Sequence, residues 1–468
     1  MNGSYDVLQF DGPERRGDCD VWTAHNDGQS DPSRQVFSCV AVYRGKWIDG
    51  VPALGGTRRL PNDDHRAADL QGCRRDGTLD DVAREAVLSE AVGLAEAMFV
   101  KNTLLRKAAE RWKESGGGTT VSYGWQGGKG VIWAPLGDDA AMEEHRLRCH
   151  GRLIDHMNGL YFGSKDQRVA ERHLRLIASE TEHVVGLQCR RDTGEATSLG
   201  VVSGLLEASR RLGLGKEAER PLAGLSVLVV GLGKVGLPLL LGLRQEGVEV
   251  AGLDSAKNLQ SGSEAGVRRH FDTNVSDGAA VDRRHLDLLL ELWGRGRLFT
   301  SEDEAMRWGD FQVLSPNGGN IEWLVEQREG LSRAERLAEV AKQRGKLRLV
   351  LGAGNDQVPL SSSRSDAREA ALSTLAEAGV WFVPDPLVSP GGVIAVSHEP
   401  VSLAALKSPV AGSRWERLRV NHDAWEIVRV AVEWFFERYG KLAGEGSLEA
   451  PDGGRIWQTF ESLVADSG

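Results

Sequence analysis

Two short runs of apolar residues in the middle of the chain predict neighbouring strands of a parallel sheet. Residues 225–230 (LSVLVV) and 248–253 (VEVAGL) are rich in β-branched residues and lack a regular polar alternation. This pattern is typical of strands that are covered on both faces. The segment between the two runs predicts a helix that ends near Glu246. Strand, helix and strand in this order predict a βαβ unit.

A glycine motif stands where this helix begins. Gly231 allows a tight turn from strand to helix, Gly233 allows the backbone to approach a pyrophosphate, and Gly236 allows the helix to pack closely on the strand. The N-terminus of the helix adds free N–H groups and a positive dipole for phosphates. The predicted cofactor-binding residues of this motif are Gly231, Gly233, Lys234, Val235 and Gly236.

Asp254 ends the second strand of the unit. A carboxylate in this place accepts hydrogen bonds from the adenine ribose and repels a 2′-phosphate, so NAD is the predicted cofactor rather than NADP. Lys257 lies nearby, and a basic side chain there would soften that preference.

Hydrophobic spacing in the rest of the chain predicts further helices and strands, with a polar loop over residues 61–80. The predicted helices are 81–112, 141–158, 166–184, 197–213, 284–294 and 419–438. The predicted strands are 37–44, 51–56, the VIWAP segment from Val131, and segments that begin near Phe311, Leu347 and Val380.

The length of 468 residues exceeds what one compact core accommodates, so two domains are expected. The fold class is α/β. An N-terminal α/β domain for substrate binding and oligomerisation, residues 1–186, is expected to precede a doubly wound Rossmann domain, residues 187–410. The final helices, residues 411–468, are expected to pack back on the first domain.

Composition narrows the class of protein. A net charge of −10 disfavours nucleic acid as the main partner. The Arg58–Arg59 pair is interpreted as part of a solvated surface. No apolar run is long enough to cross a membrane, and the first residues lack a signal-peptide core, so a cytoplasmic location is expected.

The five cysteines show no disulfide or zinc pattern, and no metal is expected. The spacing of His145, His150 and His156 does not suit metal ligands, so these histidines are interpreted as surface or interface residues.

Two lysines and an aspartate are candidates for proton chemistry. Lys101 ends the segment AMFVK, Lys129 lies in QGGKGVI, and Asp166 follows YFGSK. Two desolvated ammonium groups in one cleft lower each other's pKa, which leaves one lysine able to act as a base. Solvated surface lysines are the alternative interpretation of the residue types alone.

The order of motifs along the chain supports the catalytic interpretation. The series PALGGTR, AMFVK, GGKGVI, NGLYFGSKD, TEHVVG, TSLGV, GLGKVG, GAGNDQ and PDPLVSPGGVI resembles the glutamate/leucine/phenylalanine/valine dehydrogenase family. The likeness is strongest to its bacterial leucine and phenylalanine branch and covers roughly residues 20–440.

The resemblance implies roles for individual residues. It makes Lys129 and Asp166 the catalytic pair and Lys101 the ligand of the substrate carboxylate. It implies that Gly55 and Gly56 line the substrate cleft. It further implies a side-chain pocket formed by Leu54, Ser164, Val393 and Val396, and nicotinamide contacts from Thr197 and Asn355.

The chain departs from the family pattern at several points. A longer segment, with Gly116–Gly118 and Trp125, separates Lys101 from Lys129. Where the family has two asparagines, this chain has Asn355–Asp356. The family's Asn-Ala-Gly-Gly is replaced by Ser-Pro-Gly-Gly at Ser389–Gly392, and its Pro-Cys-Ala-Leu-Gly by Pro-Asn-Gly-Gly-Asn from Pro316. Trp125 is a candidate for the wall of the substrate pocket. Lys165 is interpreted as solvent-facing.

The expected activity is NAD-dependent oxidative deamination of an L-amino acid with an apolar or aromatic side chain, giving a 2-oxo acid and ammonia. A diverged enzyme that acts on a non-standard amino acid or imine, and a non-catalytic NAD-binding regulator, are alternatives. The expected partners are the small-molecule substrate, ammonia and further copies of the chain in a homo-oligomer.

Overall fold

The computed structural model describes two compact units that are assembled from several stretches of sequence. The described residues are 8–465 without 27–34, 46–49, 61–80, 120, 122, 135–138, 167, 188–191, 218, 256–258, 260–262, 277–280, 318–322, 329, 355–356, 361–363, 400–413, 444–447 and 449. Unit 1 comprises Met1–Thr103, Gly124–Cys189 and Glu399–Val410. Unit 2 comprises Leu104–Tyr123, Arg190–His398 and Ala411–Gly468.

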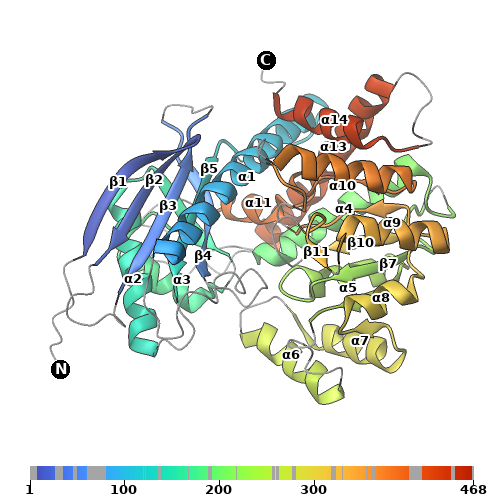
Figure 1. The fold of residues 1–468 in the computed structure, drawn as a ribbon, viewed down its shortest axis with the longest axis horizontal. Coiled ribbons are helices and arrows are strands. Elements are labelled where there is room, and N and C mark those ends of the chain that lie inside the picture. Colours follow the sequence, from blue (N-terminus) through green and yellow to red (C-terminus); the bar gives the residue numbers. More distant parts are fainter. Residues whose placement is uncertain are drawn as a thin grey trace. The chain divides into compact units, whose positions relative to one another are not determined.

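A six-stranded mixed sheet forms the centre of unit 1 (Figure 1). Its strand order is β1-β2-β3-β5-β4-β6, in which β4 runs parallel to both β5 and β6 while the other pairs are antiparallel. The strands are β1 (Gln9–Arg16), β2 (Cys19–His25), β3 (Phe37–Tyr43), β4 (Ala53–Leu60), β5 (Gln126–Trp133) and β6 (Tyr161–Lys165); the helices are α1 (Asp81–Glu114), α2 (Ala140–His156) and α3 (Glu171–Ala178).

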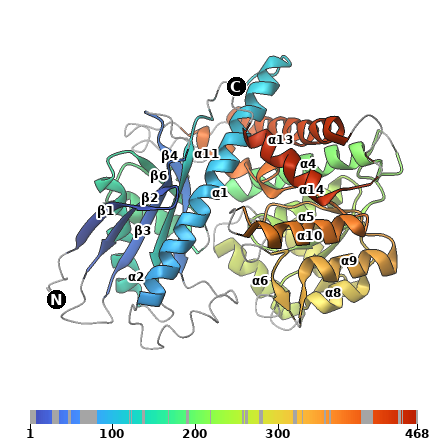
Figure 2. The ribbon, with the colours of Figure 1, turned by 45° about the horizontal axis from the view of Figure 1, so that its top comes forward.

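Helices cover both faces of this sheet (Figures 1 and 2). On one face, Cys39 and Ala41 of β3 pack with Val87 of α1. On the other face, Val40 and Val42 pack with residues of α2 and α3. Successive side chains of a strand point to opposite faces. This period assigns each residue of the neighbouring strands to the α1 face or to the α2 face.

Unit 2 contains a fully parallel sheet in the order β14-β13-β10-β7-β8-β9. Read from β9, this is the doubly wound order, and it reverses between β7 and β10. The strands are β7 (Ser226–Val230), β8 (Glu249–Leu253), β9 (Leu298–Phe299), β10 (Val313–Pro316), β13 (Leu349–Val350) and β14 (Trp381–Phe382), with a small hairpin of β11 (Gln327–Arg328) and β12 (Leu331–Ser332). The predicted α/β class with a Rossmann sheet is confirmed.

Helices surround the sheet of unit 2, and most begin or end at ordinary capping residues. Asp192 caps α4 by accepting hydrogen bonds from the backbone N–H groups of Gly194 and Glu195. The helices are α4 (Thr193–Leu212), α5 (Gly236–Gln245), α6 (Glu264–Ser276), α7 (Arg283–Gly294), α8 (Glu302–Trp308), α9 (Arg333–Arg344), α10 (Ser365–Glu377), the 3₁₀ turn η6 (Asp385–Leu387), α11 (Gly391–Ser397), α13 (Arg414–Ala443) and α14 (Gly453–Ala465).

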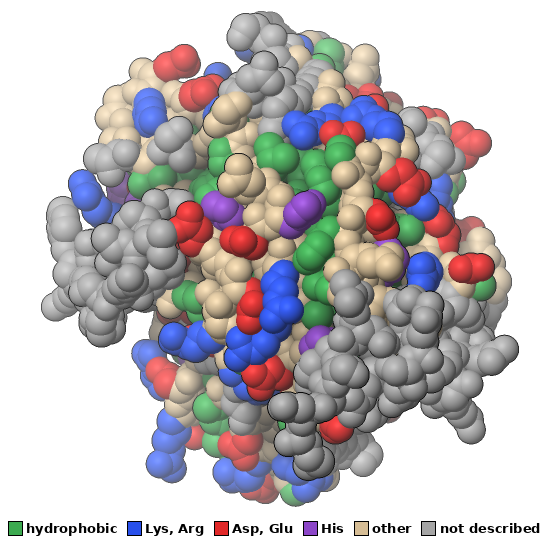
Figure 3. All heavy atoms as spheres, turned by 90° about the vertical axis from the view of Figure 1, so that its left-hand side faces the viewer, with side chains coloured by type: hydrophobic (Ala, Val, Ile, Leu, Met, Phe, Trp, Pro, Cys, Tyr) green, Lys and Arg blue, Asp and Glu red, His purple; other side chains and the backbone are tan. Residues whose placement is uncertain are grey.

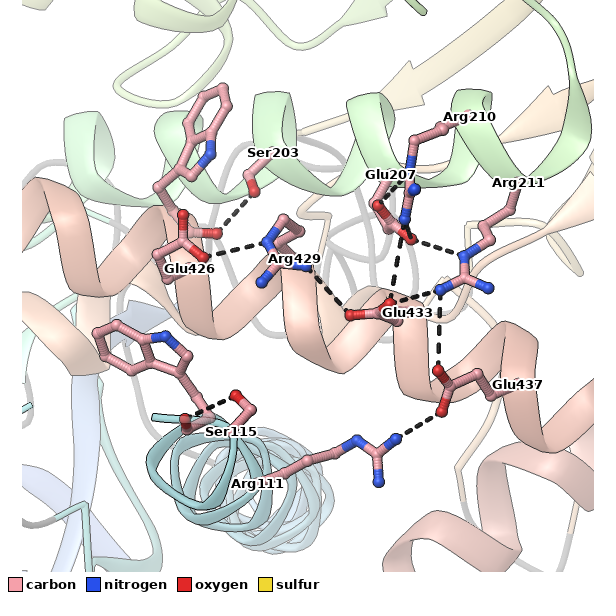
Figure 4. Close-up of polar contacts among 12 residues, drawn as sticks. Arg111, Ser115, Ser203, Glu207, Arg210, Arg211, Glu426, Arg429, Glu433 and Glu437 are labelled. Atoms are coloured by element: carbon pink, nitrogen blue, oxygen red, sulfur yellow. Dashed lines mark hydrogen bonds and ion pairs between the residues drawn. The ribbon is translucent and has the colours of Figure 1, made fainter. Parts of the chain in front are cut away.

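The long helix α13 belongs to unit 2, where it packs along α4. Figure 4 shows the ion pairs that connect these helices. Glu433 and Glu437 of α13 both pair with Arg211 of α4, and Glu437 also pairs with Arg111 near the end of α1. The sequence boundaries of the two functional domains, including the return of residues 411–468 to the first, stay predictions.

The hairpin of β1 and β2 and several helices of unit 2 escaped the sequence analysis. The predicted helix 166–184 is wrong at both ends, because α3 spans only Glu171–Ala178 and Val184 forms a bridge with Gly163 of β6. Among the described residues, no helix combines the length and apolar character that a membrane span requires.

Charges of both signs are interspersed among the described side chains in the face drawn in Figure 3. In unit 1, Arg15 pairs with Asp20, and Arg16 pairs with Glu85.

Candidate active site

Glycines of β4 allow three strands of unit 1 to come close together. A Cβ atom on Gly55 would lie 1.6 Å from the carbonyl oxygen of Gly128 in β5, and one on Gly56 would lie 2.6 Å from the Cβ of Asp166. Neither position tolerates a side chain without movement of the backbone. The hydroxyl of Tyr161 in β6 donates to the carbonyl of Gly55 over 2.7 Å, a hydrogen bond between the neighbouring strands β6 and β4.

The two predicted catalytic residues meet on the α1 face of the sheet. Lys129 lies two residues before Val131, which packs against α1, so its side chain shares that face. The Nζ atom of Lys129 donates to Oδ2 of Asp166. Lys129 is 3 % exposed. Asp166 follows directly after β6, so the two residues meet although they come from separate strands.

Arg58 of β4 contacts the same carboxylate. Its Nε donates to Oδ2 of Asp166 over 3.2 Å, and its Nη1 donates to Oε1 of Glu90 in α1 over 2.5 Å. Arg58 is only 1 % exposed. The interpretation of Arg58 as a solvated residue is therefore wrong: the period of β4 turns it towards α1, where two carboxylates compensate its charge.

Burial and charge act on the pKa of this pair in different ways. Burial is the largest influence on Lys129 and lowers its pKa, and the charge of Arg58 lowers it further, although Asp166 and Glu90 act in the opposite direction. Burial alone would raise the pKa of Asp166, but the charges of Lys129 and Arg58 outweigh it and the pKa falls. The arrangement favours an ionised Asp166 beside a lysine that gives up its proton more easily than in water.

Lys101 is also buried, at 8 % exposure, on α1. It lies eleven residues after Glu90, about three helical turns, and therefore on the same stripe of the helix. Its neighbour Asn102 donates from Nδ2 to the carbonyl of Gln126 over 2.9 Å. Gln126 begins β5, the strand of Lys129, so the structure brings both lysines to one face of one sheet.

The predicted pocket residues of unit 1 share this face. Leu54 and Gly56 of β4 alternate with residues that point to α2, and so does Ser164 of β6. The ring of Trp125 packs on Phe162, two residues before Ser164, with ring centroids 5.7 Å apart. Lys165 is half-buried and points to the opposite face from Ser164. It therefore does not turn towards Leu54.

The segment between α1 and β5 is anchored within unit 2. The carboxylate of Asp423 in α13 accepts hydrogen bonds from the hydroxyl groups of Thr119 and Tyr123, each over 2.7 Å, and from His398 over 3.1 Å. Asp423 is buried, and these donors lower its pKa although burial raises it. The segment that is longer here than in the family thus has two side chains, Thr119 and Tyr123, that are hydrogen-bonded to a buried carboxylate of α13.

The glycine motif of unit 2 has the shape that a dinucleotide requires. Gly231 has a φ of +83°, which only glycine adopts without strain. A Cβ on Gly236 would lie 1.8 Å from the carbonyl oxygen of Gly231, whereas one on Gly233 would meet nothing nearer than Asn274 at 3.9 Å. Lys234 and Val235 form the turn before α5. Close packing at Gly236 and open space at Gly233 fit a bound pyrophosphate.

Asp254 lies beside this motif at the end of β8. Its Oδ2 accepts from the N–H of Leu232 over 2.7 Å, and its Oδ1 accepts from the N–H of Ser255 over 2.7 Å. His270 and Asn274 of α6 contact the carbonyl of Leu232 from the other side. The sequence analysis did not identify these two residues, because they lie in a segment without a motif.

Thr197 and the Ser389–Gly392 segment lie together in unit 2. A Cβ on Gly391 would lie 2.3 Å from the carbonyl oxygen of Ala196, and one on Gly392 would lie 3.5 Å from Oγ1 of Thr197. Val393 and Val396 follow on α11 and are buried. The hydroxyl of Ser389 is buried and has no hydrogen-bond partner among the described residues.

Three residues named from the sequence lie outside the described residues: Asn355, Asp356 and Lys257. The histidines of α2 are described, and the surface interpretation is wrong for His150. His150 is fully buried, its Nε2 lies 3.3 Å from Oγ1 of Thr57, and burial lowers its pKa to about 3. No cluster of metal-ligating side chains occurs among the residues that the structure describes.

Sequence comparison identifies relatives that match between 44 % and 92 % of this chain. An L-tryptophan dehydrogenase from Nostoc punctiforme is 24 % identical over 352 residues, 74 % of this chain and 73 % of the relative. A phenylalanine dehydrogenase from Caldalkalibacillus thermarum is 24 % identical over 447 residues, 92 % of this chain and 94 % of the relative. Valine and leucine dehydrogenases also match. No model of a known protein family matches.

Solved structures share the fold. The structure of the L-tryptophan dehydrogenase from Nostoc punctiforme superimposes with a TM-score of 0.52 and 18 % identity, covering 98 % of this chain and 96 % of the other. The hetero-hexameric glutamate dehydrogenase from Thermus thermophilus, in its leucine-bound form, gives a TM-score of 0.57 and 18 % identity, covering 97 % and 89 %. The resemblance drawn from the motifs is confirmed.

Proposed function

Because the chain is a relative of the glutamate/leucine/phenylalanine/valine dehydrogenases, we propose that it is an amino-acid dehydrogenase that uses NAD. The proposed reaction converts an L-amino acid with an apolar or aromatic side chain to the 2-oxo acid and ammonia, and runs in both directions. The observation that carries the proposal is the contact between the buried Lys129 and the half-buried Asp166 on the α1 face of β5. Sequence relatives with dehydrogenase names support the class of reaction.

The glycine motif would hold the dinucleotide. Backbone N–H groups around Gly233 and the start of α5 would contact the pyrophosphate, and Asp254 would contact the adenine ribose. When bound, the dinucleotide would supply the acceptor for a hydride that leaves the substrate α-carbon. The preference for NAD over NADP rests on the negative charge of Asp254, which opposes a 2′-phosphate.

The chain's own residues would manage the protons. Lys101 would bind the substrate carboxylate and thereby orient the α-carbon. Asp166 would accept a proton from the substrate amine. Lys129, with its lowered pKa, would take a proton from the water that attacks the iminium carbon, and as an ammonium it would then stabilise the developing negative charge on the oxygen.

The apolar lining supports the proposed substrate class. Leu54 is buried on the α1 face, with Ser164 and the Trp125–Phe162 ring pair on the same side of the sheet. An unpaired carboxylate against such a surface costs several kcal/mol, whereas each buried methylene gains about 0.8 kcal/mol. Val393 and Val396 of α11 are buried aliphatic residues of unit 2, and the family resemblance assigns them to the side-chain pocket. This composition disfavours glutamate as the substrate.

A panel assay tests the proposal. Reduction of NAD and of NADP is followed with leucine, valine, phenylalanine, tryptophan and glutamate, and the reverse reaction is followed with the matching 2-oxo acids and ammonium. We expect turnover with apolar or aromatic substrates and NAD. Faster turnover of glutamate than of the other four, or faster turnover with NADP, would overturn the corresponding part of the proposal.

One observation favours a diverged substrate as a second candidate. Ser389 stands where the family has the asparagine that binds the substrate amine, and its buried hydroxyl has no partner among the described residues. A shorter hydroxyl in this place suits a substituted amine or an imine. Turnover of N-methyl amino acids above that of the unsubstituted forms would support this candidate.

Self-association is also part of the proposal. One structural neighbour is a hetero-hexamer, and we expect this chain to form a homo-oligomer of two or more copies. Light scattering coupled to size-exclusion chromatography measures the mass directly. A mass equal to one chain of 50.8 kDa would contradict the expectation.

A further inference from the structure

Two cations converge on a single oxygen of Asp166. Both Nζ of Lys129 and Nε of Arg58 donate to Oδ2. Oδ2 is thereby occupied from two strands, β5 and β4. No hydrogen bond to the second oxygen, Oδ1, occurs among the described residues, and we assign to it the proton from the substrate. The carboxylate is therefore oriented as well as charged, and the side chain that completes the orientation is Arg58.

Arg58 in turn is held by Glu90 of α1. The contact between Nη1 of Arg58 and Oε1 of Glu90 measures 2.5 Å, and the exposed fractions of the two side chains are 2 % and 12 %. Formal charges in this cluster alternate from Glu90 to Arg58 to Asp166 to Lys129 and sum to zero. A buried charge is tolerated when it is paired, so the cluster is internally compensated.

We propose that Arg58 and Glu90 are positioning residues for the proton chemistry of Asp166 and Lys129, with Arg58 orienting Asp166 and Glu90 limiting the field of Arg58. The inference rests on the proposed function, because it assigns these residues to the same reaction. Neither residue needs to touch the substrate.

The two residues act on the catalytic pair with opposite signs. The positive charge of Arg58 favours ionised Asp166 and disfavours protonated Lys129, so it lowers both pKa values. The negative charge of Glu90 raises the pKa of Lys129. Of the other titratable groups here, Tyr161 of β6 interacts with Asp166 and stays protonated because burial raises its pKa, and Lys165 points to the opposite face.

Because Arg58 and Glu90 shift the pKa of Lys129 in opposite directions, pH profiles can distinguish an electrostatic role from a purely structural one. The pH dependence of kcat/KM for amino-acid oxidation is measured in the wild type, Arg58→Met and Glu90→Gln. Loss of Arg58 raises the pKa of Lys129, so the pH at which activity rises moves up by about one unit. Loss of Glu90 removes a negative charge and lowers the pKa of Lys129, so the pH at which activity rises moves down. A purely structural role lowers activity by the same factor at every pH and shifts neither curve.

Additional variants separate folding from electrostatics. Arg58→Lys keeps the cation and is expected to shift the profile less than Arg58→Met. The double variant Arg58→Met/Glu90→Met removes the whole buried ion pair, so it leaves no unpaired charge to unfold the sheet. Arg333→Met is a matched control, because Arg333 is a buried arginine held by Glu302 and Glu326 in unit 2. It is expected to lose stability without a shift of the profile.

Two outcomes overturn the inference: unshifted profiles in both Arg58→Met and Glu90→Gln, or shifts of the same sign in these two variants. The proposed function fails separately, if the wild type oxidises no amino acid of the panel. In that event the pKa of Asp166 is followed by carboxyl-carbon NMR of aspartate-labelled protein. A rise of that pKa in Arg58→Met supports the electrostatic role, and an unchanged pKa removes it.

Discussion

The two candidate sites of this chain are built from different materials. In unit 1 the chemistry rests on four charged side chains: Arg58 of β4 and Lys129 of β5 are buried, and Glu90 of α1 and Asp166 after β6 are half-buried. In unit 2 the binding surface rests on backbone, with glycines that leave room and one carboxylate, that of Asp254. Truncation of these charged side chains should therefore be severe in unit 1. In unit 2 the severe change should be a methyl group added at Gly236, as it would also be at Gly55 of unit 1.

The largest expected effect is on catalysis in unit 1. Lys129→Ala and Asp166→Asn each remove one member of the proton-transfer pair, and we expect kcat to fall by roughly 10²–10⁴-fold. Binding of NAD, measured by fluorescence or calorimetry, should stay unchanged because the glycine motif lies in the other unit. Turnover close to the wild type in either variant would refute the assignment of the pair.

Methyl groups added to the glycine motif give the next largest effect. In Gly236→Ala the new Cβ would stand 1.8 Å from the carbonyl oxygen of Gly231, so the helix has to move, at a cost of about 1–3 kcal/mol of folding free energy. Gly233→Ala meets open space, so it should keep its stability and lose only affinity for the dinucleotide. Thermal unfolding and NAD titration of both variants measure this split. Equal losses of stability would contradict it.

The same contrast explains which parts were predictable. The dinucleotide motif is contiguous, so strand, glycines and Asp254 could be identified from neighbouring letters. The charged cluster required the register of β4, β5 and β6, which a sequence does not display. Lys129 and Asp166 were candidates from their residue types, and the resemblance to the family gave them their proposed roles. Arg58 was mistaken for a surface residue, since a polar pair looks solvated until the strand period and α1 are known.

His150 shows the same limit on the other face of the sheet. It lies on a helix with charged neighbours, so its burial against Thr57 depends on how α2 packs under β4 and β5. The hairpin of β1 and β2 went unpredicted because β1 is almost entirely exposed and carries no apolar alternation. A strand is predicted from the alternation of apolar and polar residues, which arises when one of its faces is buried. An exposed edge strand such as β1 has no buried face and therefore no such alternation.

His150 also supplies a pH-dependent stability for unit 1. Its pKa falls from the ordinary histidine value to about 3 in the folded protein, so only the unfolded chain takes up this proton near pH 5. Stability therefore decreases as the pH falls below about 6.5, by about 2 kcal/mol at pH 5. His150→Gln should flatten that part of the curve in urea unfolding between pH 5 and 7. An unchanged slope in the variant would show that other groups cause the loss.

The smallest expected effect concerns Asp254 of unit 2, the side chain on which the proposed preference for NAD over NADP depends. Asp254 accepts N–H groups of Leu232 and Ser255, so Asp254→Ser keeps a hydrogen-bond acceptor for the backbone but removes the charge that opposes a 2′-phosphate. A charge separation of about 4 Å near the surface corresponds to roughly 1–4 kcal/mol, so the ratio of kcat/KM for NADP to that for NAD should rise about tenfold or more. Asp254→Asn is the matched control for size, because it removes the same charge with an almost identical shape, and it should shift the ratio in the same direction. A shift in Asp254→Ser alone would mean that space, and not charge, sets the preference. Because the change leaves Lys129 and Asp166 untouched, kcat with NAD should change little, and a large fall would show that the two sites are less independent than their different construction implies.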